Sequence, residues 1–125
     1  MTAIKSLGPG KYVMVDGVAC RVLKTQSSVS GKHGSAKTRM DCVGLIDGKR
    51  RSVLKKAGTD MEIPVILKKT AQVLSISENM AQIMDTESYE TFDTEIPEEI
   101  KGEIEAGKEV NYWDIQGTKV IKGLR

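Results

Sequence analysis

The chain has 125 residues, of which 39% are apolar and 29% are charged, enough for one ordinary domain or two small ones. No apolar run is long enough to cross a bilayer, and no charged-then-apolar leader follows Met1, so we expect a cytoplasmic protein without a membrane partner. Two cysteines and one histidine exclude a disulfide framework and, unless carboxylates contribute, a four-ligand zinc site, so we expect no bound metal.

The charges are distributed unevenly along the chain. Met1–Lys68 holds 13 Lys and Arg and 5 Asp and Glu, a net charge of +8. Lys69–Arg125 holds 6 and 12, a net charge of −6. A basic half beside an acidic half indicates one surface suited to a polyanion. The alternative is that the charges only solvate two small domains.

Short runs of alternating polarity in the first half predict five β-strands. Asp16-Gly17 and Asp47-Gly48 are typical of hairpin turns. Gln26–Lys37 is polar and aperiodic, so we expect a long hairpin loop there. Five strands joined in this way predict a small SH3-like barrel. The predicted strands are Tyr12–Val15, Val18–Thr25, Thr38–Leu45, Lys49–Leu54 and Met61–Leu67.

The two cysteines are expected on buried strand positions. Cys20 and Cys42 lie on the two strands that the Gln26–Lys37 loop joins. If that loop turns near Gly31 or Lys32, both side chains have the same parity about the turn and point to one face of the sheet.

The second half follows the same β pattern with one short helix inserted. Pro97 followed by two acids is a good helix start, Ile100 and Ile104 give an apolar edge, and Gly107 ends it. Three strands, a helix and two strands are the order of an OB-fold. We expect an all-β protein with domains 1–68 and 69–125. The predicted strands here are Ala71–Ser77, Gln82–Asp85, Tyr89–Thr94, Val110–Ile115 and Lys119–Leu124.

The segment Ser30–Lys37 is the most informative of the chain. Gly31 and Gly34 allow a tight tip with positive φ, and the small Ser35 and Ala36 keep bulk away from it. We therefore expect Lys32 to be presented to solvent. An exposed lysine on a flexible stem suits contact with a phosphate or enzymatic extension, although most loop lysines only solvate a surface.

The same segment comes close to the phosphate-loop pattern G-x-x-x-x-G-K-[ST]. Ala36 stands where that pattern needs its second glycine, which lets backbone amides wrap the phosphates. The pattern also needs a helix beginning at its lysine, whereas we predict a strand after Lys37. We therefore do not expect a nucleotide-hydrolysing enzyme.

Gly31-Lys32-His33-Gly34, followed by Ala36-Lys37, matches the hypusine loop of translation factor 5A of archaea and eukaryotes, whose first lysine is the modified one. The resemblance covers almost the whole chain. At Ser35, where eukaryotic members carry a second histidine, the chain resembles archaeal members. We expect two domains here, without the third domain of elongation factor P, the bacterial relative. Further matching segments are Tyr12–Val22, Thr70–Ser75 and Gln82–Asp85.

The resemblance implies that Lys32 is converted to deoxyhypusine or hypusine. Deoxyhypusine synthase would transfer the aminobutyl group of spermidine, with NAD as the synthase's own cofactor. The chain itself would hold no cofactor and would not be an enzyme. As a monomer on the ribosome, it would place Lys32 beside the acceptor end of peptidyl-tRNA and promote peptide-bond formation. Contacts to transfer RNA or ribosomal RNA are implied for Gly31, His33, Gly34, Ser35, Lys37 and Arg39. Lys24 is a further candidate for a phosphate contact.

The residues before the loop depart from the family pattern. Archaeal members often carry basic residues and a proline before the loop, whereas this chain has Ser27-Ser28-Val29-Ser30, so we expect a looser loop.

The alternative function is a general RNA-binding module or RNA chaperone built on the OB-fold half. That half has few aromatic residues and a net charge of −6, which disfavours a single-strand binder. Its aromatic residues are Tyr89, Phe92, Tyr112 and Trp113.

Overall fold

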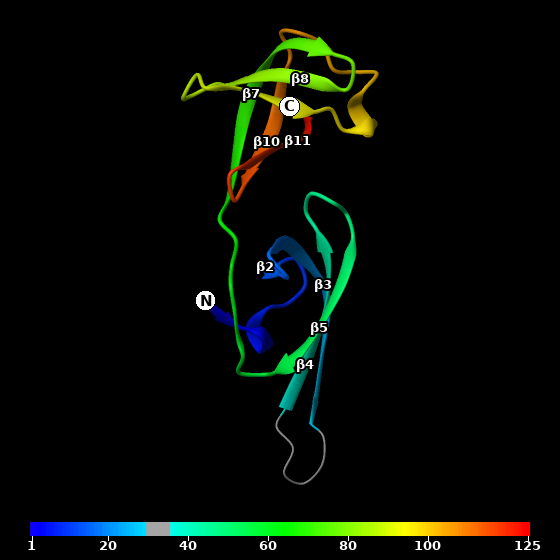
Figure 1. The fold of residues 1–125 in the computed structure, drawn as a ribbon, viewed down its shortest axis with the longest axis vertical. Helices are drawn as coiled ribbons and strands as arrows, with labels where there is room; N and C mark the ends of the chain where they lie inside the picture. Colours follow the sequence, from blue (N-terminus) through cyan, green and yellow to red (C-terminus); the bar gives the residue numbers. More distant parts are fainter. Residues whose placement is uncertain (30–35) are drawn as a thin grey trace. The chain divides into compact units, whose positions relative to one another are not determined.

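The computed structural model describes residues 1–29 and 36–125. This part of the chain is nearly all β and divides into two units, Met1–Pro64 and Val65–Arg125. Each unit has its own main antiparallel sheet (Figure 1). Each also has its own cluster of buried residues. The predicted all-β class is therefore confirmed.

The first unit is built on a four-stranded sheet in the order β2-β3-β4-β5. A second, two-stranded sheet pairs the short β1 with β6, and a 3-10 turn, η1, follows β1. The bounds are β1 Thr2–Ala3, η1 Ile4–Ser6, β2 Tyr12–Val15, β3 Val18–Val29, β4 Ala36–Gly44, β5 Arg50–Lys56 and β6 Asp60–Met61. One buried face of the unit gathers Ile4, Leu7, Val13, Val15, Cys20, Val22, Met40, Cys42 and Met61.

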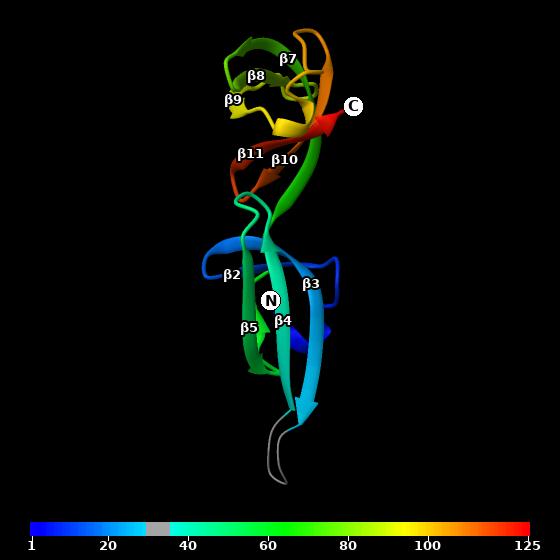
Figure 2. The same ribbon diagram turned by 90° about the vertical axis from the view of Figure 1, so that its right-hand side faces the viewer.

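The hairpin of β3 and β4 is longer than the sequence predicts. Its pairing continues past the core to Val29 and Ala36, so much of the segment expected to be a loop is paired strand (Figure 2). Ser27 and Ser28 are exposed strand residues there. Hydrophobic alternation reports a buried face, whereas Gln26–Ser28, Ala36 and Lys37 are exposed, so alternation could not reveal this part of the hairpin. Ser27–Val29 therefore belong to the paired strand, whereas residues 30–35, on which the expected looseness of the loop depends, lie outside the described residues.

Met61–Leu67 is not the single strand that was predicted. β6 ends at Met61, and the next strand begins only at Ile66. Pro64 lies between them, and because proline has no N–H it cannot donate to a sheet ladder. The apolar run thus supplies the end of one unit and the start of the other.

The two cysteines lie as predicted. Val22 pairs with Cys42, and Cys20 pairs with Gly44, so both thiols have the same parity on neighbouring strands. Both are fully buried in the same apolar cluster, and neither is in a disulfide.

The second unit is a five-stranded sheet in the order β11-β10-β7-β8-β9. The hydroxyl of Thr94 on β9 donates to the carbonyl of Lys119 on β11 at 3.3 Å, so the two edges of the sheet approach each other. Lys68–Thr70, where the sequence changes charge, lie within β7. The bounds are β7 Ile66–Ser77, β8 Met80–Asp85, β9 Thr91–Glu95, β10 Glu109–Ile115 and β11 Thr118–Leu124.

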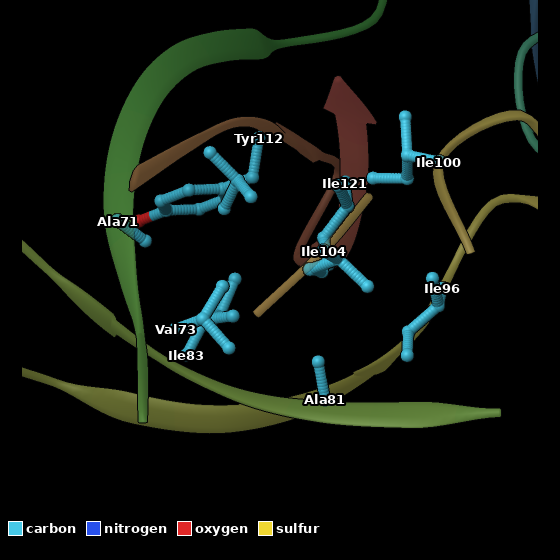
Figure 3. Packing of buried hydrophobic residues seen from close by; sticks show 10 residues of the cluster. Ala71, Val73, Ala81, Ile83, Ile96, Ile100, Ile104, Tyr112 and Ile121 are labelled. Atoms are coloured by element: carbon cyan, nitrogen blue, oxygen red, sulfur yellow. The ribbon is translucent and has the colours of Figure 1, made fainter. Parts of the chain in front are cut away.

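The predicted short helix is a single 3-10 turn, η2 (Glu98–Ile100). Ile100 and Ile104 are both buried, and the N–H of Ile104 donates to the carbonyl of Ile100 at 3.0 Å. Figure 3 shows these side chains pointing into the interior that the strands enclose. The other members of this cluster are Ala71, Val73, Ala81, Ile83, Ile96, Val110, Tyr112 and Ile121.

A carboxylate is buried beside this core. Asp85 is only 2% exposed and accepts hydrogen bonds from the Tyr112 hydroxyl and from the N–H groups of Glu87 and Ser88. Burial disfavours the charged carboxylate, but these three donors outweigh burial and lower the pKa of Asp85 to about 2. Burial and the contact with Asp85 raise the pKa of Tyr112. The pair therefore ties β8 to β10 through a charged hydrogen bond.

We expect the protein to lose stability in acid, because the pKa of Asp85 is lowered in the folded state. Its folded-state pKa lies below the ordinary value of 3.8, so the unfolded chain binds the proton first as the pH falls. The stabilisation is complete above about pH 4 and is lost towards about pH 2, on the order of 2 kcal/mol in total. Urea unfolding at several pH values measures this slope. Asp85→Asn should have a shallower acid slope than the parent, and equal slopes would contradict the assignment.

Candidate nucleic-acid interface

The predicted site residues fall into two groups. Gly31, Lys32, His33, Gly34 and Ser35 lie outside the described residues. The chain enters that segment from β3 and leaves it into β4, which carries Lys37 and Arg39, the two site residues that the structure describes.

The pleat of β4 decides which of its side chains meet solvent. Thr38, Met40 and Cys42 are buried, whereas Lys37 and Arg39 between them are exposed. Successive side chains of a strand point to opposite faces. Lys37 and Arg39 therefore lie together on the outer face, with Asp41 two residues further along.

Neighbouring strands add further cations to this outer face. The residues of β3 and β5 that pair with outward-facing residues of β4 lie on the same face of the sheet. We call the resulting surface the basic face. Its six exposed cations are Arg21, Lys24, Lys37, Arg39, Arg50 and Lys56.

Asp41 is the acid at the centre of the basic face. It accepts a hydrogen bond from Ser52 at 2.6 Å and lies 3.5 Å from Arg39 Nε and 3.7 Å from Lys24 Nζ. The hydrogen bond from Ser52, aided by the nearby cations, lowers the pKa of Asp41. Exposed ion pairs of this kind contribute little stability. Their effect here is to fix the direction in which the two cations point.

Other cations of the basic face are held close together. Lys37 on β4 lies directly opposite Lys56 on β5. Like charges facing each other across a sheet destabilise it, and a bound polyanion relieves that repulsion. Contacts of Lys and Arg with phosphates position a nucleic acid without reading its sequence. The basic face is thus suited to hold an RNA backbone next to the Lys32 segment.

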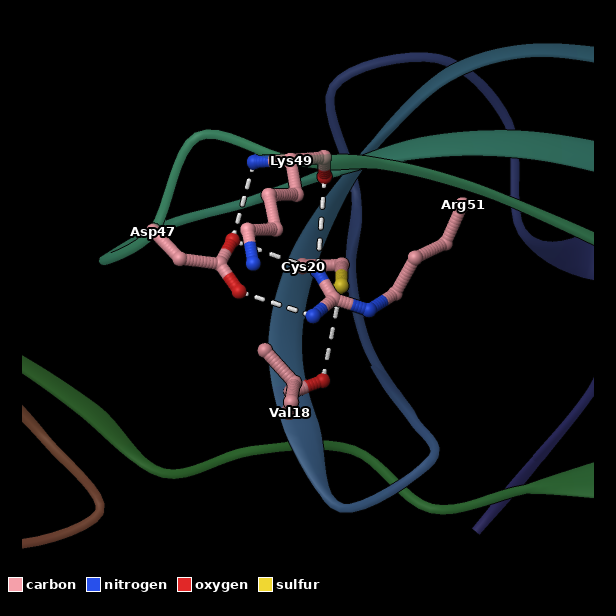
Figure 4. A network of polar contacts seen from close by, with 5 residues as sticks. All are labelled: Val18, Cys20, Asp47, Lys49 and Arg51. Atoms are coloured by element: carbon pink, nitrogen blue, oxygen red, sulfur yellow. Dashed lines mark hydrogen bonds and ion pairs between the residues drawn. The ribbon is translucent and has the colours of Figure 1, made fainter.

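A separate polar network holds the turn between β4 and β5. Asp47 accepts hydrogen bonds from Arg51 Nη2 at 2.7 Å and from the N–H of Lys49 at 2.9 Å (Figure 4). These bonds, chiefly that from Arg51, lower the pKa of Asp47 to about 2. A Cβ on Gly44 would lie 2.1 Å from Asp47 Oδ1, so any larger residue there would have to displace the Asp47 carboxylate. The network fixes the turn and thereby the register of β5 against β4.

Sequence reasoning missed three residues of the basic face. Arg21, Arg50 and Lys56 were placed on or near predicted strands, but nothing linked them to the Lys32 segment. A signal existed, because Arg21 and Arg50 occupy the outward parity of their strands. Only the pairing of β3 and β5 with β4 shows that they share one face.

Within residues 1–29 and 36–125, no helix is long and apolar enough to cross a membrane. The same residues contain no group of three His, Cys, Asp or Glu side chains placed to hold a metal ion.

Two family models match the chain. Residues 2–57 match "Translation initiation factor 5A-like, N-terminal", and residues 65–125 match "Eukaryotic elongation factor 5A hypusine, DNA-binding OB fold". The second match confirms the OB-fold predicted for the second unit. Among similar proteins, translation initiation factor 5A of Methanocella arvoryzae is 46% identical, covering 91% of this chain and 89% of that protein. The Pyrococcus furiosus protein of the same name is 43% identical, covering 98% and 91%.

Solved structures agree with these matches. Eukaryotic translation initiation factor 5A from Methanococcus jannaschii superposes with a TM-score of 0.89 at 37% identity, covering 99% of this chain and 92% of that one. A family protein from Naegleria fowleri gives a TM-score of 0.81 over 99% and 96% at 24% identity, a likeness of fold alone. The chain belongs to the translation initiation factor 5A family, a family of translation factors and not of enzymes.

Proposed function

We propose that the chain binds the ribosome and promotes peptide-bond formation at difficult sequences through Lys32 extended to deoxyhypusine or hypusine. The observation that carries the proposal is the Gly31-Lys32-His33-Gly34 motif on the connection between β3 and β4, next to the basic face, in a member of this family. The motif supplies the group to be extended. The basic face supplies the anchor for RNA.

The extension makes Lys32 longer without making it bulky. Deoxyhypusine synthase would transfer the aminobutyl group of spermidine to Lys32 Nζ: a carbon–nitrogen bond of spermidine breaks, 1,3-diaminopropane leaves, and a new carbon–nitrogen bond to Nζ forms. The NAD of the synthase takes up a hydride and returns it, so the transfer involves no net oxidation. The product carries two amines on a thin apolar tether, which can enter a crowded anionic cavity that a folded loop cannot. This tether suits contact with the acceptor end of peptidyl-tRNA.

The chemistry of peptide-bond formation remains that of the ribosome. The factor contributes by reducing the freedom of a poorly placed acceptor end, so that attack geometry is populated more often. The phosphate contacts of Lys37, Arg39 and their neighbours hold the protein in position for this. His33, Gly31, Gly34 and Ser35 support the presentation of Lys32.

Reconstituted translation of a template with a proline run tests the proposal. Protein made with the synthase and spermidine should relieve the stall, whereas the same chain made without the synthase should not. A template without prolines is the control, on which both preparations should act alike. Equal activity of the two preparations on the proline run would overturn the proposal.

Replacing Lys37 by alanine should weaken ribosome binding modestly. The change removes one phosphate contact, so the slope of log affinity against log salt should fall by about 1. Lys11→Ala is the matched control, because Lys11 is also exposed in the first unit but lies outside the basic face. Ribosome co-sedimentation over a series of salt concentrations measures both. An unchanged slope in Lys37→Ala would remove this residue from the interface, whereas modification of Lys32 should proceed in both variants.

A further inference from the structure

The second unit is acidic, but its lysines are not spread evenly. Val65–Arg125 contains 7 Lys and Arg and 12 Asp and Glu. Three of those seven cations, Lys68, Lys69 and Lys122, line one open groove of about 780 Å³ on β7, β10 and β11. The average charge of the unit therefore conceals a local basic site.

Trp113 organises the groove. It stands directly opposite Lys68 across the β10–β7 pair and is partly exposed. The ammonium of Lys68 lies 4.5 Å from the centre of the indole ring, and that of Lys122 lies 4.7 Å from it. Cation–π attraction thus holds two ammonium groups around one aromatic side chain.

The acids of the groove do not cancel this charge. Of the twelve acids in the unit, only Asp85 and Glu87 line the groove. Asp85 is buried and committed to the Tyr112 hydroxyl and to two backbone N–H groups. The lining of the groove therefore carries three lysines against one exposed carboxylate, that of Glu87. Neutral hydrogen-bonding groups are added by Thr70, Thr86 and Asn111.

The surface on which OB-folds usually bind nucleic acid has the opposite character here. That surface is centred on the second and third strands of the fold, which are β8 and β9 in this chain. Neither strand contains Lys or Arg, and β9 carries Asp93 and Glu95. A polyanion is repelled by that surface and attracted to the groove on β7, β10 and β11.

We propose that the groove formed by Lys68, Lys69, Trp113 and Lys122 is a second RNA-binding site, which holds the phosphate backbone of a single strand. Phosphates meet the ammonium groups, and a base or ribose packs on Trp113. An acidic protein segment would satisfy the charges but offers no flat ring for the indole. The ribosomal origin of the RNA rests on the proposed function, whereas the binding chemistry does not.

Trp113 is the only tryptophan of the chain, so its fluorescence reports this site. The test titrates oligouridylate into full-length protein carrying Lys37→Gln and Arg39→Gln, which weakens the basic face. RNA should quench the tryptophan, and three phosphate contacts should give a slope of log affinity against log salt of about −2. Adding Lys68→Gln and Lys122→Gln should bring the slope to about −0.7 and lower affinity about tenfold.

Two controls separate binding from general effects of charge and folding. Lys101→Gln with Lys108→Gln removes the same charge from the same unit outside the groove and should leave quenching unchanged. Lys68→Arg with Lys122→Arg keeps the charge and the cation–π contacts and should retain binding. Circular dichroism should show that every variant folds.

Three outcomes would overturn the proposal. They are no quenching by oligouridylate, equal loss of binding in the Lys101 and Lys108 control, or stronger quenching by an oligoglutamate peptide than by RNA. None of these depends on modification of Lys32. An unmodified Lys32 would refute the proposed function and leave the groove's affinity for RNA intact.

Discussion

Lys32→Arg is expected to abolish support for translation of proline runs while leaving the fold unchanged. Arginine keeps the positive charge, but its guanidinium cannot accept the aminobutyl group as the lysine amine does. We expect Lys32 to be exposed on a tip between Gly31 and Gly34, and arginine keeps its charge and length, so the unfolding free energy should stay within about 0.5 kcal/mol of the parent. The Lys32→Arg variant should therefore lose activity without losing stability.

Complementation in a host that depends on the factor measures the activity, and urea unfolding measures the stability. Lys11→Arg is the matched control, because it makes the same chemical change at an exposed lysine outside the basic face. Growth of the Lys32→Arg strain at the parental rate would show that extension of Lys32 is dispensable. A large loss of stability would instead show that Lys32 has a structural role.

The largest effect on stability is expected at the buried pair of Asp85 and Tyr112. Tyr112→Phe keeps the ring, which packs edge-to-face against Phe92 at 5.1 Å, and removes only the hydroxyl. The charged carboxylate of Asp85 then loses a donor in a site shielded from water. Loss of such a hydrogen bond costs about 1.5–3 kcal/mol. For a domain of this size, the melting temperature should fall by roughly 10 °C.

Tyr89→Phe is the matched control for this change. Tyr89 is 70% exposed, so losing its hydroxyl should leave the melting temperature close to that of the parent. Asp85→Ala should cost more than Tyr112→Phe, because it strands the hydroxyl and two N–H groups together. Equal melting temperatures for Tyr112→Phe and Tyr89→Phe would show that the pair does not stabilise the unit.

Strands with one buried face could be predicted closely from sequence. Tyr12–Val15 is observed with the predicted bounds, because its buried and half-buried residues alternate and Asp16-Gly17 ends it. Asp16 and Gly17 both have positive φ, as the hairpin turn requires. Gln116 and Gly117 form the same kind of turn between β10 and β11. Local chemistry specifies these elements.

Elements that depend on distant partners were not predictable in the same way. β1 is two residues long and exists through its pairing with β6, some sixty positions away in the chain. The outer parts of β3 and β4 bury no face and carry no hydrophobic signal. The start of β7 at Ile66 follows an interruption at Pro64 within an apolar run. Hydrophobic periodicity reveals only strands that bury one face, so a strand that pairs without burying a face gives no such signal.

The candidate site divides along the same line. Lys32 could be singled out because glycines and small residues in a contiguous segment specify its chemistry locally. The basic face could not, because its cations come from three strands and meet only through the sheet. The groove around Trp113 was hidden for a further reason. The count of charges by halves assigns Lys68 to the basic half and averages Lys69 and Lys122 with the acids of the other half, so it does not bring the three lysines together.

The mass of the peptide that contains Lys32, from protein purified out of its native host, tests the proposed function most directly. We expect Lys32 to carry the aminobutyl extension, with or without a hydroxyl group, and no other lysine to carry it. Recombinant protein made without the synthase should show unmodified lysine at this position. Native protein with an unmodified Lys32, or with the extension on a different lysine, would contradict the assignment.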